Sequence, residues 1–542
     1  MSLHSLRIVS STWVITFASI VTSVPVLAAP PEASTLFPSG GKVGESVTVA
    51  IGGNVKPWPV QAWTDDKHLT IEAEKKEGQV VIKIGKDAEP GVHWLRFMNA
   101  DGASSPRAFV VGTLPELTEK EPNNELTKAA LLSGPTTING RLGSAGDVDV
   151  FGVELSQGQT LVVDVDAEIP LNSPVDSVLQ VVDSGGFVLA QNNDDVGLDP
   201  RIVFIAPKPG KYYARLFGYS STPSSAVGFG GGDTFIYRMT ITTGPFIDYA
   251  YPLAVKHGES TQVDLLGWSI GKPASMKLKL DNSVSSARAF FGAAAGYANV
   301  LAVDVPVMIE KEPNDAKQAQ TITLPIAISG RCDTPGDVDV FAFDAKKGQR
   351  IFAKVESRVL GFVTDPVIML LDSTEKIMTT VDDTDKQRDS ELATGISADG
   401  RYRLLVRDLY RHGSPRHAYL LTIRVDEADY QLSLAATETV LDEGKSVELP
   451  VTIDRRPGFN EEIAFEVRGL PEGVKVDAPK SAAKGETAKS VKLKLSGGKS
   501  PWSGAIQIVG ISQGDKKLER IASGKVVNYL GVWTQLWLTV KK

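Results

Sequence analysis

The hexapeptide Gly-Asp-Val-Asp-Val-Phe occupies residues 146–151 and returns unchanged at 336–341, 190 positions later. Two further segments repeat around it in the same order: Glu-Lys-Glu-Pro-Asn at 119–123 and 310–314, and Lys-Tyr-Tyr-Ala-Arg-Leu at 211–216, which corresponds to Arg-Tyr-Arg-Leu-Leu-Val at 401–406. The spacing between the copies is nearly constant. The chain therefore contains two copies of a whole domain.

A second match lies upstream of each copy. Phe37-Pro38 and the segment 42–49 match Tyr251-Pro252 and the segment 256–263, at a spacing of 214 residues. The second copy of this upstream region is therefore shorter, and the last part of the chain carries neither motif. A repeated domain pair is typical of an array of modules rather than of one catalytic body. The expected divisions are a signal peptide at 1–28, module A1 at 29–113, module B1 at 114–244, module A2 at 245–306, module B2 at 307–426 and module C at 427–542.

Alternating polar and apolar residues predict strands almost throughout. Residues 161–166 and 491–495 show this period of two, and Gly, Pro, Asn and Asp interrupt the pattern every 8–12 residues. Short strands with such turns predict an all-β protein, a tandem array of antiparallel β-sandwiches that are jelly-roll-like in the B modules and Ig-like in the A and C modules. One helix-like stretch is expected in B1, at 126–132.

Composition narrows the class of protein. A chain of 542 residues exceeds the size of one hydrophobic core. The formal charge of −8 leaves no basic excess to neutralise phosphates, so nucleic acid is not an expected partner. The single cysteine excludes an intramolecular disulfide framework, an iron–sulfur cluster and a Cys-rich zinc site.

The N-terminus has the order of a secretory signal peptide. Arg7 precedes the apolar run 13–21, and small residues follow at 28–29, so cleavage is expected after Ala28. The alternative is an uncleaved signal anchor, but the run is short and interrupted by polar residues for a bilayer span of about 20 residues. No cysteine follows the run, which argues against a lipoprotein. The mature chain is expected to be secreted or to lie in the periplasm or cell envelope, with no membrane span.

The motifs of the B modules resemble the bacterial pre-peptidase C-terminal domain. They occur in the order Glu-x-Glu-Pro-Asn-(Asn/Asp), Gly-Asp-x-Asp-x-Phe, an Asn-Asp-Asp turn and Gly-x-Tyr-Tyr. The resemblance implies a small β-sandwich that accompanies secreted proteases and collagenases, where it binds substrate polymer, and that also occurs in non-enzymatic exported proteins. The A modules are similar, less specifically, to IPT/TIG Ig-like domains.

The resemblance also implies calcium. In the collagenase relatives the first motif supplies calcium ligands together with acidic residues near the following strand, and calcium takes six to eight hard oxygens. Carried over by position, the implied metal ligands are Glu119, Glu121, Asn123, Asn124, Asp147 and Asp149 in B1, and Glu310, Glu312, Asn314, Asp315, Asp337 and Asp339 in B2. Because Asn124 carries no charge where B2 has Asp315, the B1 site is expected to be weaker. The alternative is that these are solvated linker and strand-start residues.

Two other groups of polar residues are typical of ordinary loops rather than of metal sites. Asn193-Asp194-Asp195 and Asp382, Asp383 and Asp385 are expected to form turns, since aspartate hydrogen-bonds its own backbone there. His412 and His417 stand five residues apart in a loop, and a shared metal there is the less favoured interpretation.

Each sequence pattern that could indicate catalysis has a better non-catalytic interpretation. Gly-x-Ser-x-Gly at 267–271 needs a strand-to-helix turn, but a strand pattern resumes at Met276, which predicts a β-turn. None of the six histidines forms a His-Glu-x-x-His pair. The glycine-rich stretch 228–232 leads into a strand, unlike a phosphate loop. Cys332 falls at the position of Leu142 and is expected to be a buried apolar residue.

Two functions therefore remain. The first is a non-catalytic exported protein that binds an extracellular polysaccharide or protein polymer or envelope proteins, in adhesion or as a scaffold. The second is an accessory subunit or degenerate member of a secreted hydrolase or peptidase system. The enzyme hypothesis requires a pocket in which polar groups converge, whereas the binding hypothesis requires grooves or exposed aromatic side chains on the sandwiches.

Overall fold

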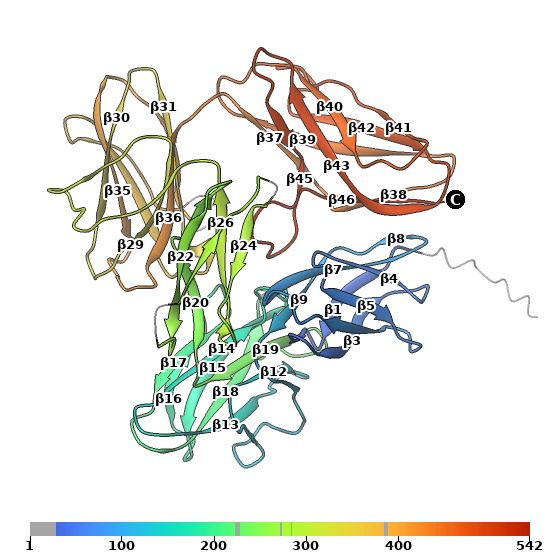
Figure 1. The fold of residues 1–542 in the computed structure, drawn as a ribbon, viewed down its shortest axis with the longest axis vertical. Helices are drawn as coiled ribbons and strands as arrows, with labels where there is room; N and C mark the ends of the chain where they lie inside the picture. Colours follow the sequence, from blue (N-terminus) through green and yellow to red (C-terminus); the bar gives the residue numbers. More distant parts are fainter. Residues whose placement is uncertain (1–28, 223–227, 272–273, 283, 384–388, 542) are drawn as a thin grey trace, which may run out of the picture.

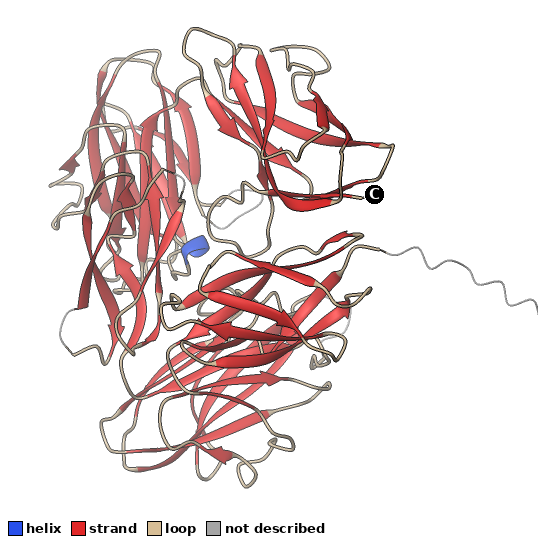
Figure 2. Cartoon of the chain, turned by 45° about the vertical axis from the view of Figure 1, so that its right-hand side comes forward, coloured by secondary structure: helices blue, strands red, loops and turns tan. Residues whose placement is uncertain are grey.

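The computed structural model describes residues 29–541 except 223–227, 272–273, 283 and 384–388. The predicted signal peptide lies outside this part of the chain. The described residues are nearly all strand and turn, and their one helix is the short 3-10 helix Arg358–Leu360 (Figure 2). The predicted all-β class is confirmed. No helix in these residues has the length and apolar character needed to cross a membrane.

The strands form sheets that follow one another in pairs along the sequence, and each pair encloses its own buried apolar core (Figure 1). The module names above are kept for these segments. The boundaries of the modules stay a prediction.

Module A1 has sheets in the orders β1-β3-β6-β5 and β2-β9-β7-β4, and β8 pairs with β7. Its strands are β1 Glu32–Phe37, β2 Gly40–Lys42, β3 Ser46–Asn54, β4 Gln61–Thr64, β5 Leu69–Ala73, β6 Gln79–Ile84, β7 Gly91–Asn99, β8 Gly102–Ala103 and β9 Arg107–Gly112.

Module B1 has two five-stranded sheets, β10-β12-β19-β14-β17 and β11-β13-β18-β15-β16. The pairs β10–β12 and β11–β13 are parallel, and the others are antiparallel. Its strands are β10 Glu116–Thr118, β11 Ala130–Leu131, β12 Thr136–Arg141, β13 Asp149–Leu155, β14 Thr160–Asp166, β15 Val175–Asp183, β16 Val188–Asn192, β17 Arg201–Ile205, β18 Gly210–Ser220 and β19 Ile236–Thr242.

Module B2 repeats this topology strand for strand, in the orders β27-β29-β36-β31-β34 and β28-β30-β35-β32-β33. Its strands are β27 Val307–Ile309, β28 Gln320–Thr321, β29 Ile326–Arg331, β30 Asp339–Ala345, β31 Arg350–Glu356, β32 Pro366–Leu371, β33 Ile377–Val381, β34 Glu391–Gly395, β35 Gly400–Asp408 and β36 Ala418–Val425.

Module A2 is smaller, with sheets β23-β22-β20-β25 and β21-β26-β24. The Gly-x-Ser-x-Gly segment starts in the last two residues of β22, and the next strand, β23, is antiparallel to β22, which agrees with the predicted turn. Its strands are β20 Phe246–Tyr251, β21 Ala254–Lys256, β22 Thr261–Trp268, β23 Ala274–Leu278, β24 Ser286–Ala289, β25 Ala295–Gly296 and β26 Ala298–Val303.

Module C has sheets β41-β42-β39-β37-β45 and β38-β46-β43-β40, and β44 pairs with β43. Its strands are β37 Tyr430–Leu434, β38 Glu438–Leu441, β39 Ser446–Arg455, β40 Ile463–Arg468, β41 Val474–Asp477, β42 Ser490–Gly497, β43 Trp502–Ser512, β44 Glu519–Ile521, β45 Ser523–Gly524 and β46 Leu536–Val540.

The alternating apolar residues of the strands face the core, as the sequence predicts, and one residue on the opposite face is buried as well. Leu161, Val163 and Val165 of β14 face the B1 core. Val162, on the opposite face, is also buried, because it packs against Phe246 of module A2. Cys332 and Leu142 are both buried in their respective cores, as predicted.

The expected helix at 126–132 is wrong. Residues 126–128 form a turn, and β11 follows at Ala130–Leu131, where it pairs with β13. A segment this short gains more from joining the sheet than from one isolated helical turn, because helix nucleation is unfavourable.

The chain does not extend as a linear array, since module C returns to module A1 (Figure 1). Trp63 and Trp94 of A1 meet Trp533 of module C, with ring centroids 6.1 and 6.4 Å apart. Arg96, which is 1% exposed, donates to Glu438 at 3.2 Å beside these rings. Aromatic rings and a buried arginine are the residues that dominate stable interfaces, so the two ends of the chain are held together.

A network of buried charges joins modules B1, A2 and B2. Arg201 of B1 donates to Asp164 at 2.6 Å and also pairs with Asp248 of A2. Arg416 of B2 contacts Asp195 of B1 at 2.5 Å and Asp248 at 2.8 Å. The expected turn role of Asp195 is thus incomplete, because its carboxylate is an inter-module ion-pair partner.

Replacing Arg416 with glutamine should destabilise this junction. Asp195 and Asp248 would lose a cation while remaining mostly buried, at a cost of about 2–3 kcal/mol, less than for an isolated buried pair because Arg201 still contacts both. Urea denaturation of the mature chain measures the loss. The control is Arg468→Gln, whose pairs with Glu466 and Glu519 are exposed and screened by solvent, so their loss should have a much smaller effect. Equal effects of the two substitutions would contradict this account of the junction.

Candidate metal centre

The candidate site lies where each B module begins. β10 pairs in parallel with β12, and the chain continues so that the Glu119 backbone N–H donates to the Asn139 carbonyl. The Arg141 backbone N–H donates to the Glu119 carboxylate at 2.5 Å. In B2 the Arg331 N–H donates to Glu310 in the same way, also at 2.5 Å. Sheet pairing therefore holds the first glutamate of the motif beside the last residue of β12 in B1 and of β29 in B2.

Three carboxylates converge in each copy. The candidate ligand atoms of Glu119, Glu121 and Asp149 all lie within 4.8 Å of one another. In B2, Glu310, Glu312 and Asp339 do the same. In both groups the aspartate is fully buried, and the second glutamate is exposed, so each cluster opens to solvent on one side.

A buried tyrosine, which the motifs did not indicate, bridges two of the carboxylates. Tyr237 Oη lies 2.9 Å from Glu119 and 2.8 Å from Asp149. Tyr419 Oη lies 3.3 Å from Glu310 and 2.6 Å from Asp339. One hydroxyl carries one proton, so it cannot satisfy both anions fully. Extending the repeat comparison to the last strand of each copy would have aligned the two tyrosines.

Burial and mutual repulsion disfavour the charged forms of these groups. Desolvation, followed by the charge of Glu119, raises the pKa of Asp149. Desolvation and the charge of Asp339 raise the pKa of Glu310 in the same manner. Without a cation these carboxyl groups therefore tend to keep a proton, and a bound cation would favour their charged forms.

Buried oxygens with free lone pairs complete the arrangement. Asn123 and Asn314 are 2% and 0% exposed. Among the described residues, their side-chain Oδ1 atoms have no hydrogen-bond partner, and neither do the Oδ1 atoms of Asp149 and Asp339. Unpartnered buried oxygens beside carboxylates form the hard-oxygen donor set that calcium prefers, so the residues present fit a calcium ion.

The other implied ligands have different roles in the structure. Asp147 and Asp337 cap the loops before their strands by accepting backbone N–H groups, from Gly143 and Val148 and from Asp333 and Val338 respectively. Asn124 donates to Asp147 at 2.9 Å.

Asp315 is exposed, and its carboxylate accepts the N–H groups of Lys317 and Gln318 in the next turn. The expected difference in affinity between the copies rested on Asp315, but the converging groups carry the same three carboxylates. Similar affinities are therefore the better expectation.

A separate cavity of about 760 Å³ lies at the module junction. Residues of all five modules line it, including Asp166, Arg201, Arg238, Asp248 and Arg416. Three of its arginines pair with carboxylates: Arg201 and Arg416 as described above, and Arg238 with Glu116 at 2.7 Å. The pairs of Arg201 and Arg416 with Asp248 cross module boundaries, whereas the Arg238 pair lies within B1.

Comparison with known proteins finds a family similarity in one part of the chain. The family described as "Bacterial pre-peptidase C-terminal domain" matches residues 147–218, which run from Asp147 to near the end of β18. No curated protein matches the chain.

Several solved structures are similar to parts of the chain. The pre-peptidase C-terminal domain of a Bacillus anthracis collagenase matches with 20% identity, covering 23% of this chain and 100% of that one, with a TM-score of 0.17. PliG, a periplasmic inhibitor of g-type lysozyme from Aeromonas hydrophila, matches with 15% identity over 22% of this chain and 97% of its own, with a TM-score of 0.16. A mutant Salmonella alpha-2-macroglobulin matches with 9% identity over 96% of this chain and 47% of its own, with a TM-score of 0.16.

Replacing Tyr419 with phenylalanine should destabilise the mature chain in the absence of divalent cations. Two buried carboxylates would lose their shared donor, at a cost of about 2 kcal/mol. The control is Tyr402→Phe in the same module, since Tyr402 Oη donates only to the Ala398 carbonyl, and its loss should cost about 1 kcal/mol. Urea denaturation in EDTA compares the two variants. A smaller effect at Tyr419 than at Tyr402 would show that the hydroxyl does not stabilise the carboxylates.

Proposed function

We propose that this chain is a non-catalytic, exported bacterial protein that binds a partner protein through module B1, with calcium held at the entrance of both B modules. The observation that carries the binding role is an exposed apolar edge on B1. The family match at 147–218 supports the proposal, because pre-peptidase C-terminal domains occur in secreted bacterial proteins. The shared strand order supports the assignment of B2 to the same family.

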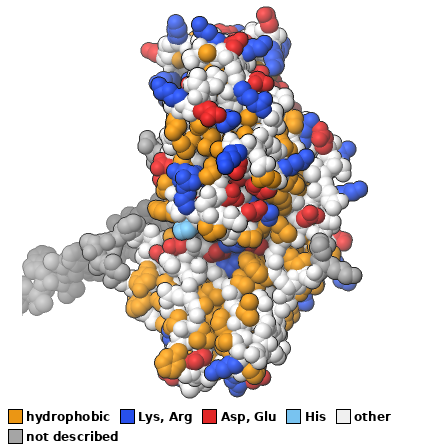
Figure 3. Space-filling view, turned by 90° about the vertical axis from the view of Figure 1, so that its left-hand side faces the viewer, with side chains coloured by type: hydrophobic (Ala, Val, Ile, Leu, Met, Phe, Trp, Pro, Cys, Tyr) orange, Lys and Arg blue, Asp and Glu red, His pale blue; other side chains and the backbone are white. Residues whose placement is uncertain are grey.

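The apolar edge lies on β16 and β17, which are the last strands of the two B1 sheets. Phe187 is 73% exposed, Ile205 64%, Leu189 42% and Val203 37%. Figure 3 shows the side of the molecule that lies on the left in Figure 1. Hydrophobic side chains gather on its lower part, which carries β16 and β17. Exposed apolar patches beside free strand edges mark sites of protein association.

The second copy shows that the sandwich does not need this edge. Strand pairing places Lys376 of B2 where B1 has Phe187, because Val182 pairs with Val188 as Leu371 pairs with Ile377. Gly395 likewise stands where B1 has Ile205, since β31 pairs with β34 in the register of β14 with β17. The fold tolerates polar or small residues at these positions, which favours a binding role for the apolar set in B1.

The hydrolase alternative requires a pocket with free converging groups. The junction cavity is the candidate, but its residues Arg201, Arg238 and Arg416 are each paired with carboxylates, and its described lining residues include no histidine or cysteine. Such pairing suits an inter-module contact better than acid–base or nucleophilic chemistry. The non-catalytic proposal follows from this arrangement.

Calcium should stabilise the mature chain against heat. A ligand that binds only the folded form contributes about 2.7 kcal/mol at a hundred times its Kd, so millimolar calcium should raise the melting temperature by about 5 °C over EDTA. The double variant Glu121→Gln with Glu312→Gln should lose most of this rise. Glu125→Gln is the control, because Glu125 lies outside the cluster and pairs with Lys128. An unchanged melting temperature in calcium would show that the clusters are solvated carboxylates.

The apolar edge should determine retention on protein targets. Pull-down of the mature chain on immobilised collagen and on envelope protein fractions, with calcium present, should fall at least about tenfold for Phe187→Lys with Ile205→Thr, because an exposed anchor and its neighbour are lost together. The control is Ile377→Lys, at an exposed apolar position of B2. Retention on polysaccharide that is equal for all three proteins, without retention on protein, would contradict the proposal.

A further inference from the structure

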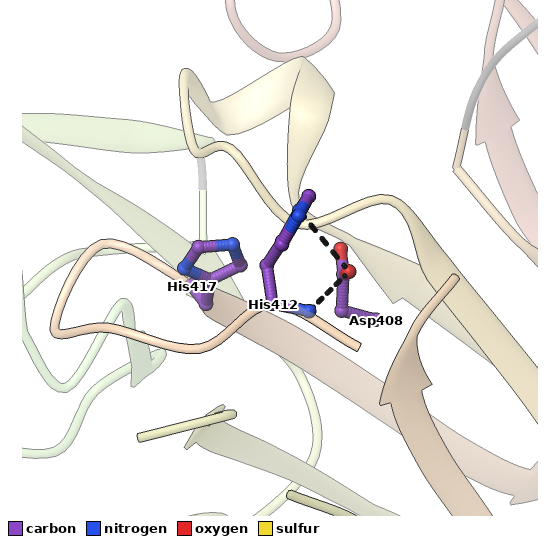
Figure 4. Close-up of side chains that lie close together, drawn as sticks. All are labelled: Asp408, His412 and His417. Atoms are coloured by element: carbon purple, nitrogen blue, oxygen red, sulfur yellow. Dashed lines mark hydrogen bonds and ion pairs between the residues drawn. The ribbon is translucent and has the colours of Figure 1, made fainter. Parts of the chain in front are cut away.

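The loop between β35 and β36 of module B2 brings one carboxylate and two imidazoles together (Figure 4). We propose that Asp408, His412 and His417 bind a divalent transition-metal ion of the zinc class. The candidate ligand atoms of the three side chains all lie within 4.8 Å of one another. The sequence showed only the two histidines, because Asp408 ends the preceding strand and its proximity depends on how the loop folds.

The loop is fixed by backbone hydrogen bonds. Asp408 is 2% exposed, and its Oδ1 accepts the N–H groups of Tyr410 and His412, each at 2.9 Å. Its Oδ2 accepts one N–H group, from Asp365, at 3.0 Å, and retains a lone pair. The carboxylate is therefore held in place by the protein and does not depend on a metal for its position.

His417 is oriented by a second side chain. Its Nδ1 lies 2.8 Å from Ser414 Oγ, and the Arg416 backbone N–H also donates to this oxygen. The His417 ring turns its other side toward His412 (Figure 4). A hydrogen bond at one ring nitrogen that leaves the other as a ligand is the usual support of a metal-binding histidine.

The spacing suits a metal after a small adjustment. His412 Nδ1 lies 3.8 Å from Asp408 Oδ1, and Oδ2 of the same carboxylate keeps the lone pair that a metal would use. Ligands at about 2.1 Å from a tetrahedral ion lie about 3.4 Å apart, so donors that now lie within 4.8 Å of one another need to close by about 1.4 Å at most. The His412 side chain is 70% exposed and is free to rotate by that amount.

The equivalent loop of B1 lacks all of these groups. The Cys332 N–H donates to the His417 carbonyl, and the Ser414 N–H donates to the Cys332 carbonyl. In B1 the same two bonds join Leu142 to Phe235 and Gly232, so Phe235 and Gly232 stand in place of His417 and Ser414. Gly218 stands in place of Asp408 by strand register. The sandwich closes this loop without any of the metal-binding groups.

The donor set selects the ion. Two imidazoles and one carboxylate suit zinc and its first-row neighbours, whereas calcium prefers oxygen ligands only. Three protein ligands leave at least one position for water or for a donor from a partner. Arg416, next to His417 in the chain, does not oppose the ion with a free charge, because it is paired with Asp195 and Asp248.

Zinc titration of the mature chain tests the site. Calorimetry in millimolar calcium, which keeps the acidic clusters occupied if they bind it, should show one zinc ion per chain. His412→Ala should weaken binding at least about tenfold. His417→Phe should do the same and should fold, because B1 carries phenylalanine at this position. The control is His257→Ala, which removes a histidine paired with a single carboxylate, Asp304, and should leave binding unchanged.

Ser414→Ala tests the positioning of His417. It should weaken zinc binding by about tenfold while the melting temperature in EDTA stays that of the wild type. Cobalt(II) bound in place of zinc should show the visible absorption bands of an ion held by nitrogen and oxygen ligands. His417→Phe should abolish these bands. The proposal is overturned if no stoichiometric zinc binds, or if His412→Ala and His417→Phe bind zinc as tightly as the wild type. The result does not depend on the calcium proposal, because the acidic clusters and the histidine loop share no ligand.

Discussion

Arg416 and Arg201 share Asp195 and Asp248, and this ion-pair network determines how three modules sit together. Charges at such a boundary lose most of their hydration, and they are stable there only because each has partners of opposite sign from another module. Any rotation of B2 against B1 would separate Arg416 from Asp195. The same constraint shapes the junction cavity, whose walls come from all five modules, and together with the tryptophan contacts between A1 and C it makes the chain a closed assembly.

The two B modules show what the fold requires and what it leaves free. Both keep the three carboxylates, the buried asparagine and the bridging tyrosine at the module entrance, on the same strands and with similar distances. They differ at positions that the shared strand topology does not fix. B1 has an apolar edge where B2 has Lys376 and Gly395, and B2 has His417 and Asp408 where B1 has Phe235 and Gly218. One sandwich topology thus presents two different surfaces to solvent.

Local patterns predicted what depends on local physics. Alternation at 161–166 placed a strand with its core face correct, and the comparison with Leu142 placed Cys332 in the core. Partners far apart in sequence were beyond such reasoning: Asp195 had the signature of a turn residue, and its ion-pair partner Arg416 lies 221 positions away. The acidic motif found the converging glutamates, but it also included Asp315, whose short side chain caps the nearest turn instead. Motif spacing shows which residues are neighbours along the chain, whereas the packing of one sheet on the other decides which carboxylates meet.

The two candidate ion sites of B2 are joined by one segment of chain. The Cys332 backbone exchanges hydrogen bonds with Ser414 and His417 of the histidine loop, and the Gly336 N–H donates to the Arg411 carbonyl of that loop. A few residues further on, the same segment reaches Asp339 of the acidic cluster. An ion at either end would restrict this segment, since its backbone is fixed to both loops. In B1 the matching segment is anchored to the acidic cluster in the same way, but it leads to Phe235 and Gly232, so among the described residues it is B2 that places two candidate ion sites on one piece of backbone.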